Sequence, residues 1–195
     1  IHVHETPGEV EQSLAQHCVR PLERLHRLGL LGPGLIGVHA VHLDEREIAL
    51  LAENNCAVAH CPTSNMKLAS GAAPTALLAK RGVRIGLGTD GAASNNRLDL
   101  FQEMRHAGLL AKVTSGDAAV LNAHELLRMA TLNGAAALGM EDRIGSIKPG
   151  KAADLCAIRL DALETLPCFD PASHLVYAAG REHVSHVWVN GVLQV

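Results

Sequence analysis

The sequence lacks both an excess of basic residues and a cysteine framework. The formal net charge of its 195 residues is −3, and its Lys and Arg clusters are short pairs such as Lys80-Arg81, so we exclude a phosphate-binding face and nucleic acid as a partner. The five cysteines are odd in number and show no CxxC spacing. They favour reduced thiols in a cytoplasm over disulfides or a thiolate zinc site.

Long apolar runs and targeting segments are also absent. No stretch of about 18 apolar residues indicates membrane insertion, and no charged-then-apolar leader indicates export. The chain begins at Ile1 inside a strand-like run and ends at Val195 in another, so we expect both ends to continue in a longer protein. A hydrophobic content of 48% is ample for a buried core, and a small molecule is the expected partner.

Apolar periodicity predicts an α/β fold of four units, each a strand followed by a helix. The predicted pairs are Ile1–Glu5 with Glu9–Leu28, Leu35–His39 with Asp44–Glu53, Cys56–Cys61 with Pro74–Arg81, and Val83–Gly88 with Leu98–Val113. A further helix is expected over Asn122–Leu138. Asp44 and Glu47 form a capping box. Residues 144–195 are β-rich, with a hairpin at Asn190-Gly191, and residues 1–143 form the preceding unit.

Polar residues gather where these strands end. Asp90 follows an apolar strand within the glycine-rich segment Gly86–Asn96, and His2, Glu5, His39 and His60 stand at or near the ends of other strands. A single Asp after a strand is normally a helix cap, and a single His is normally a packed or surface residue. Several polar strand ends together are typical of the mouth of a barrel.

These residues carry a family resemblance. The segments are Ile1-His2-Val3-His4-Glu5-Thr6, Val38-His39, Ala59-His60-Cys61-Pro62 with Asn65, Gly88-Thr89-Asp90-Gly91, and Gly145-Ser146-Ile147-Lys148-Pro149-Gly150. Together they resemble the metal-dependent amidohydrolase superfamily, within it the branch of methylthioadenosine/S-adenosylhomocysteine deaminases and triazine hydrolases. The resemblance implies a TIM-type (β/α)8 barrel followed by part of a small β-sandwich domain.

The spacing of the motifs indicates which part of that fold is present. His2 and Asp90 are roughly 90 residues apart, which is about three βα units of ~30 residues. The first strand is therefore the fifth of the barrel, and Asp90 ends the eighth. The family's first-strand HxH pair and its strands one to four have no counterpart here. We expect the missing N-terminal half-barrel to be needed for the complete site, and this chain alone to be inactive.

The resemblance also implies a reaction and a set of roles. The reaction is zinc-dependent hydrolytic deamination of an adenine nucleoside thioether, with one zinc per site, or Fe²⁺ or another divalent metal in its place. His2 and Asp90 would bind the metal, and Asp90 would also accept the proton of the attacking water. Glu5 would protonate the ring nitrogen, and His39 would orient the water. The implied substrate contacts are Glu5, His39, Ser94 and Asn95.

Other polar residues have simpler expected roles. His60 would shape the mouth, and His4 would pack or support the site. Cys61 and His60 are adjacent in a strand and face opposite ways, which argues against a nucleophile-base pair. Lys67 fits a solvated side chain as well as a substrate contact. Solvated positions are expected for His17, His26, His42 and His106.

Three alternatives remain open. Guanine deamination and triazine hydrolysis belong to the same superfamily and would use the same residues. In a different class, the chain would be a non-catalytic partial barrel that assembles with another chain, and homo-oligomers are possible in either case.

Overall fold

The computed structural model describes all 195 residues, and its centre is a four-stranded parallel sheet. The strands are β1 (His2–Val3), β2 (Ile36–His39), β3 (Ala57–His60) and β4 (Arg84–Leu87), and their order in the sheet follows the sequence. Each pair of neighbours is connected through helices, as parallel strands require. The predicted α/β class with a parallel sheet is confirmed.

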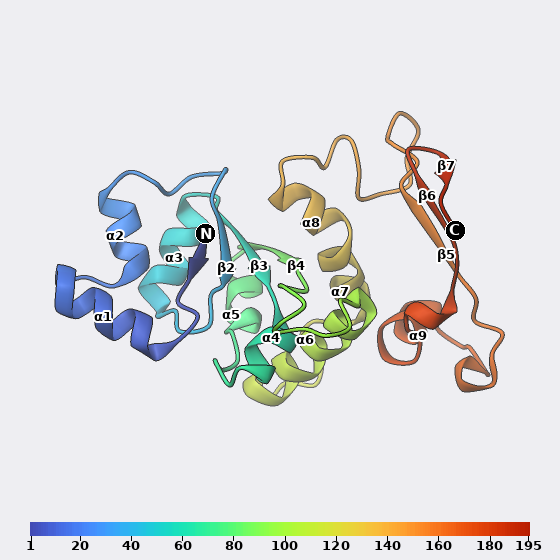
Figure 1. Ribbon diagram of the computed structural model, residues 1–195, viewed down its shortest axis with the longest axis horizontal. Coiled ribbons are helices and arrows are strands. Elements are labelled where there is room, and N and C mark those ends of the chain that lie inside the picture. Colours follow the sequence, from blue (N-terminus) through green and yellow to red (C-terminus); the bar gives the residue numbers. More distant parts are fainter.

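Helices occupy every connection along this sheet (Figure 1). They are α1 (Pro7–His17), α2 (Pro21–Arg27), α3 (Glu45–Glu53), α4 (Pro62–Lys67) and α5 (Thr75–Lys80), followed by α6 (Leu100–Ser115), α7 (Ala123–Ala130) and α8 (Leu132–Ala137). The main core lies between strands and helices, where Val3, Val58 and Ile85 pack with the apolar faces of α2, α3, α5, α6 and α7. This packing fixes the strands and therefore their ends.

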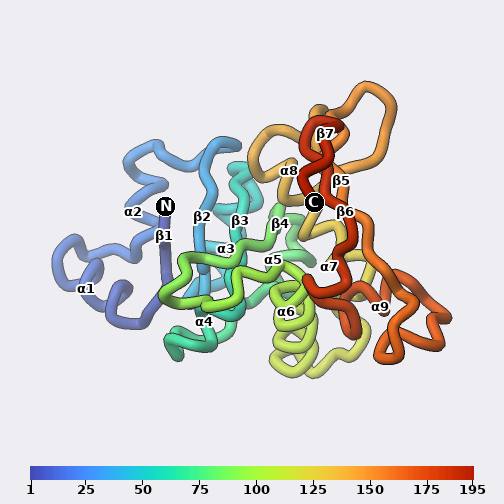
Figure 2. Tube along the Cα trace, turned by 45° about the vertical axis from the view of Figure 1, so that its right-hand side comes forward, coloured from blue at the N-terminus to red at the C-terminus, as the bar shows by residue number.

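The C-terminal part forms a second, antiparallel sheet of β5 (Leu155–Ile158), β6 (Val184–Val189) and β7 (Val192–Leu193). The predicted hairpin is present, and Asn190 and Gly191 both have positive φ, 50° and 80°, as a tight hairpin turn needs. Two 3-10 turns (Leu163–Thr165 and Arg181–His183) and α9 (Pro171–Tyr177) lie between β5 and β6. Figure 2 shows this sheet as a layer of its own, apart from the parallel sheet of β1 to β4.

Two predicted helices are each divided in the structure. The predicted helix Glu9–Leu28 is wrong as one element, because Cys18 adopts a left-handed φ of 57° and Pro21 begins α2. The predicted helix Asn122–Leu138 is interrupted at Thr131, whose φ and ψ of −129° and −95° are not helical. The sequence prediction also missed α4 and α9.

Helix α9 connects the C-terminal part, residues 144–195, to the helices of residues 1–143. The Arg105 side chain on α6 donates hydrogen bonds to the carbonyls of Val176 and Ala179, at 3.2 and 2.7 Å. Residues 144–195 are therefore not β structure alone, since their helix packs against the helices of residues 1–143. None of the helices is long and apolar enough to cross a membrane.

Candidate functional site

The predicted site residues lie at one edge of the parallel sheet. Strand β2 ends at His39 and β3 at His60, while Glu5 and Asp90 follow β1 and β4 within a few residues. In a parallel sheet all carboxyl ends meet at the same edge, so the register alone brings these positions together. The pairing of Val3 with His39 and of His60 with Leu87 aligns the strand ends.

Left-handed backbone conformations decide where the side chains point. His4, His39 and Asp90 have φ values of 55°, 73° and 59°, which are uncommon for residues other than glycine and are concentrated at functional sites. Because the strand alternation ends at His4, Glu5 returns to the side of His2 and His39, while His4 turns into the helix layer.

Three of the predicted residues form a cluster of donors. His2, His39 and Asp90 each offer one atom, and these atoms lie within 4.8 Å of one another. The rings of His2 and His39 have centroids 5.2 Å apart. Glu5 adjoins the cluster, because its Oε2 lies 3.7 Å from Nε2 of His39. All four residues predicted to bind metal or carry catalysis therefore meet.

Asp90 is held as an anion. Its Oδ2 accepts hydrogen bonds from the hydroxyls of Ser64 and Ser94, at 2.6 and 2.8 Å, and its Oδ1 accepts the backbone N–H of Gly91 at 2.7 Å. These bonds, the one from Ser64 first, lower the pKa of Asp90 to about 2 against the opposing effect of burial. The carboxylate is ionised at neutral pH, as a metal ligand must be.

His39 is oriented by a buried amide. Its Nδ1 lies 2.8 Å from Oδ1 of Asn65, and both side chains are buried. With Nδ1–H donating to that oxygen, the neutral ring keeps a lone pair on Nε2, the nitrogen nearest Glu5. That nitrogen can accept a hydrogen bond from water or bind a metal ion.

The donor set fits a zinc ion. Imidazole and carboxylate are typical ligands of a catalytic zinc site, which keeps a further position for water; His2 and Asp90 offer one of each, and His39 lies close enough to contact that water. Carboxylate and imidazole nitrogen also suit Fe²⁺ and other divalent metals. The hydrogen bonds that Asp90 accepts are of the kind that orient a metal ligand.

Ser94 and Asn95, the predicted substrate contacts, are both buried. The Ser94 hydroxyl donates to Asp90. The Asn95 amide nitrogen donates to the Thr89 carbonyl and to Glu103, and its oxygen accepts the Leu98 N–H. Since its polar atoms all have protein partners, Asn95 holds the loop together.

His60 and Cys61 have the properties of buried neutral groups. Burial lowers the pKa of His60 to about 4 and raises the pKa of Cys61 to about 12, with the nearby charges of Asp90 and Glu103 adding to the second effect. The thiol is therefore protonated at neutral pH and is a poor nucleophile. This supports the sequence argument against a Cys61–His60 pair.

The expectation of solvated histidines is wrong for two of the four. Nε2 of His42 lies 2.7 Å from the Ser70 carbonyl oxygen, and Nδ1 of His106 lies 2.8 Å from the Thr63 hydroxyl. Periodicity could not show these contacts, because the partners are distant in the sequence. His17 and His26 are exposed, as predicted. Lys67 binds the Ala93 carbonyl and the Asn96 side chain, at 2.8 and 2.7 Å, and so fastens the loop after β4.

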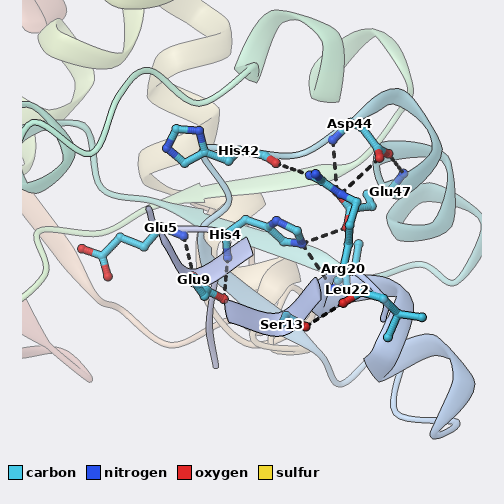
Figure 3. A network of polar contacts seen from close by, with 10 residues as sticks. His4, Glu5, Glu9, Ser13, Arg20, Leu22, His42, Asp44 and Glu47 are labelled. Carbon is cyan, nitrogen blue, oxygen red and sulfur yellow. Dashed lines mark hydrogen bonds and ion pairs between the residues drawn. The ribbon is translucent and has the colours of Figure 1, made fainter. Parts of the chain in front are cut away.

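His4 belongs to a polar network behind the site (Figure 3). Its ring is fully buried, and its Nε2 lies 2.9 Å from Oε1 of Glu47. Arg20 donates to the other oxygen of Glu47 from two nitrogens, at 2.9 and 2.8 Å. The network joins the end of β1 to α3 and keeps His4 away from the donor cluster.

Sequence reasoning missed most of the residues that hold the site in shape. Ser64, Glu9 and Glu103 carry no motif of their own, although Ser64 directly precedes Asn65, one of the residues that carry the resemblance. A hydroxyl one residue before that amide is the one signal that could have pointed to a partner for Asp90.

The chain resembles known proteins over its whole length. The model of the amidohydrolase family matches residues 1–193. A 5-methylthioadenosine/S-adenosylhomocysteine deaminase of Teredinibacter turnerae is 51% identical over 98% of this chain and 43% of its own length. The chain thus spans less than half the length of this curated relative.

Two solved structures also match the whole of this chain and less than half of their own length. An adenosine deaminase from Xanthomonas campestris with bound zinc matches 100% of this chain and 44% of its own, with a TM-score of 0.98 and 52% identity. A zinc complex of atrazine chlorohydrolase from Arthrobacter aurescens TC1 matches 100% of this chain and 43% of its own, with a TM-score of 0.93 and 32% identity.

Proposed function

We propose that this chain, which belongs to the amidohydrolase family, is the C-terminal half of the catalytic barrel of a zinc-dependent deaminase. Its four parallel strands would be barrel strands five to eight, and residues 144–195 would return to a small β-sandwich domain. The length supports this assignment, because the chain matches 43% of its relative from Teredinibacter turnerae. Strand order following sequence order also supports it.

The proposed reaction is hydrolytic deamination of an adenine nucleoside thioether, such as methylthioadenosine or S-adenosylhomocysteine. The observation that carries it is the cluster of His2, His39 and Asp90 within 4.8 Å, with Glu5 beside it. The name of the relative from Teredinibacter turnerae supports the substrate class.

Each residue has a role in that reaction. His2 and Asp90 hold the metal, and His39 orients the attacking water through Nε2. When bound, zinc supplies Lewis acidity that makes water acidic near neutral pH. Asp90 accepts the proton of the water as its oxygen attacks the amino-bearing ring carbon, and Glu5 donates a proton to the adjacent ring nitrogen. The proton held by Asp90 then passes to the amino group, the bond from carbon to that group breaks and ammonia leaves, and the hydroxyl proton of the intermediate returns to Glu5 as the ring carbonyl forms.

The remaining ligands are proposed to come from outside these 195 residues. Two histidines on a first barrel strand would complete the metal site, so this chain alone should bind zinc weakly and turn over little or no substrate. The exposed position of His2 is consistent with a face that another part of the protein covers.

The fold of atrazine chlorohydrolase, matched at a TM-score of 0.93, makes triazine hydrolysis the second candidate. Guanine deamination is a further candidate, and the assay described below tests it as well. Glu5 suits protonation of a ring nitrogen in all three cases, so the substrate must be identified by assay.

The test is zinc content and release of the leaving group by the longer protein that contains this chain: ammonia from adenosine thioethers and guanine, and ammonia or chloride from triazines. We expect one zinc per site and release from the thioethers, with loss of turnover in Asp90→Asn and Glu5→Gln and normal turnover in Glu11→Gln, an exposed carboxylate on α1. Normal turnover in both site variants would overturn the mechanism. Release from guanine or triazines alone would overturn the substrate class, and no release from any of them would leave the partial barrel as the better hypothesis.

A further inference from the structure

Helix α6 contains a fully buried carboxylate, Glu103, whose hydrogen-bond donors are both uncharged. Its Oε2 accepts the backbone N–H of Thr63 at 3.0 Å, and its Oε1 accepts the side-chain amide of Asn95 at 2.7 Å. Burying a carboxylate is costly unless hydrogen bonds compensate for the lost water. An apolar residue would fill the space at lower cost, so the position of this group calls for a reason other than packing.

The two donors belong to the two segments that hold Asp90. Thr63 precedes Ser64 at the start of α4, and Asn95 follows Ser94 in the loop after β4. The hydroxyls of Ser64 and Ser94 converge on the same atom, Oδ2 of Asp90. Glu103 therefore connects the two chain segments whose serine hydroxyls both donate to Oδ2 of Asp90.

The arrangement distinguishes the two oxygens of Asp90. A carboxylate oxygen offers about two lone-pair positions, and both serine hydroxyls occupy those of Oδ2. Oδ1 accepts the single N–H of Gly91 and keeps one position. A metal ion that Asp90 binds would therefore meet Oδ1.

We propose that Glu103 is a positioning residue for Asp90: by holding Thr63 and Asn95, it keeps both serine hydroxyls on Oδ2 and leaves Oδ1 as the reactive oxygen. The inference rests on the proposed function for what Oδ1 then binds. The placement of the two hydroxyls depends on the fold alone.

Two neighbouring contacts provide controls. His106, one turn further along α6, contacts the Thr63 hydroxyl but not Asn95. Glu125 on α7 accepts the backbone N–H of Asn122 in a capping box and has no connection to Asp90. Glu125→Gln thus removes a carboxylate acceptor of backbone N–H without touching the site.

The experiment is a double-mutant cycle on zinc affinity, measured by competition with a chelator in the longer protein. Glu103→Gln preserves volume but replaces one acceptor by an NH₂ group, so one of its two donors loses its partner. We expect about 10- to 100-fold weaker zinc binding, with less than about threefold change in Glu125→Gln and His106→Gln. In a Ser64→Ala/Ser94→Ala background, Glu103→Gln should change the affinity less than about threefold, because the groups through which it acts are gone.

A different pattern would overturn the proposal. An equal loss in both backgrounds would make Glu103 a structural residue, and an unchanged affinity in the wild-type background would give it no role at Asp90. If Glu103→Gln does not fold, Asn95→Ala, which removes one of the two donors, enters the same cycle against Ser94→Ala, with the same criteria.

A second readout separates this inference from the proposed function. Crystal structures of the metal-free wild type and Glu103→Gln should differ at Oδ2, which keeps two hydroxyls in the first and loses at least one in the second. If the wild-type protein neither binds zinc nor releases ammonia, the proposed function fails, while this comparison still decides the positioning role. Two hydroxyls on Oδ2 in both structures would refute it.

Discussion

The carboxylate of Glu9 accepts the backbone N–H of Glu5 at 2.9 Å, and its second oxygen accepts the preceding N–H at 3.0 Å (Figure 3). Glu9 thus stands in the first turn of α1 and fixes the left-handed turn that ends β1. That turn sends Glu5 toward His39. A side chain on one helix thereby sets the direction of the proposed proton donor.

The first prediction concerns Glu9→Gln. A glutamine offers one acceptor oxygen where the turn presents two N–H donors, so the turn should loosen and Glu5 should lose its alignment. Because small displacements of a reacting group cost up to about 100-fold in rate, we expect kcat of the longer protein to fall about 10- to 100-fold with little change in KM. Steady-state ammonia release measures both.

The control for this change is Glu11→Gln on the exposed face of the same helix, which should keep the wild-type kcat. A Glu9→Gln protein with unchanged kcat would show that the turn is held by other contacts. An equal fall in both variants would indicate a general effect of charge on α1.

The second prediction is a pH dependence from His60. Its pKa is about 4 in the folded protein, because of burial, against 6.5 in the unfolded chain. Between these values the unfolded state binds more protons, so stability is complete above pH 6.5 and decreases as the pH falls toward 4. The difference corresponds to about 3 kcal/mol. The stability contributed by Asp90, whose pKa is about 2, is complete above its unfolded value of 3.8 and is lost only as the pH falls below that value.

Thermal unfolding of the metal-free protein between pH 7 and 4.5 tests this dependence. The unfolding midpoint should fall with pH in the wild type and fall less in His60→Gln. His17→Gln, at an exposed histidine of α1, should behave as the wild type. Parallel pH curves for all three proteins would assign the acid sensitivity to other groups.

The third prediction concerns the pair of Arg20 and Glu47. The Glu47 side chain is only 2% exposed, and burial alone would raise its pKa, but hydrogen bonds from His4 and Arg20 lower it below the usual value. Arg20→Ala leaves this buried carboxylate with fewer donors, so we expect a loss of about 2 kcal/mol in the free energy of unfolding. Denaturant titration measures it.

Arg27→Ala is the matched control, because Arg27 pairs with Glu23 on the surface of α2 and is 62% exposed. Such pairs contribute about 0.5 kcal/mol or less. If both alanine variants lost the same free energy of unfolding, the buried pair of Arg20 and Glu47 would contribute no more to stability than the pair of Arg27 and Glu23.

Local signals in the sequence predicted much of this fold. The order of strands and helices, the Asn190-Gly191 turn and the Asp44–Glu47 capping box depend on near neighbours in the chain, and each is present. The residues at the strand ends could be predicted to lie together, because parallel strands present their carboxyl ends at one edge of the sheet.

The rest depends on contacts between distant segments. The break at Thr131 places α8 against β4. The spacing of apolar residues over Asn122–Leu138 does not predict this packing. Ser64, one partner of Asp90, and Ser70, the partner of His42, lie 26 and 28 residues away, so no spacing rule could identify them.

The last prediction concerns the close approach of Gly86 to α8. A Cβ at Gly86 would lie 3.0 Å from Cα of Gly134, which is backbone and cannot move aside. We therefore expect Gly86→Ala to cost about 1–3 kcal/mol in the free energy of unfolding, as overpacked cores do, and to shift the strand that precedes Asp90. Gly32→Ala, where a Cβ meets nothing within 4 Å, should cost far less. Since β4 carries Asp90 at its end, zinc affinity should fall in Gly86→Ala and not in Gly32→Ala. A Gly86→Ala protein with wild-type stability would show that α8 yields easily, and that the glycine is not needed for the position of the strand.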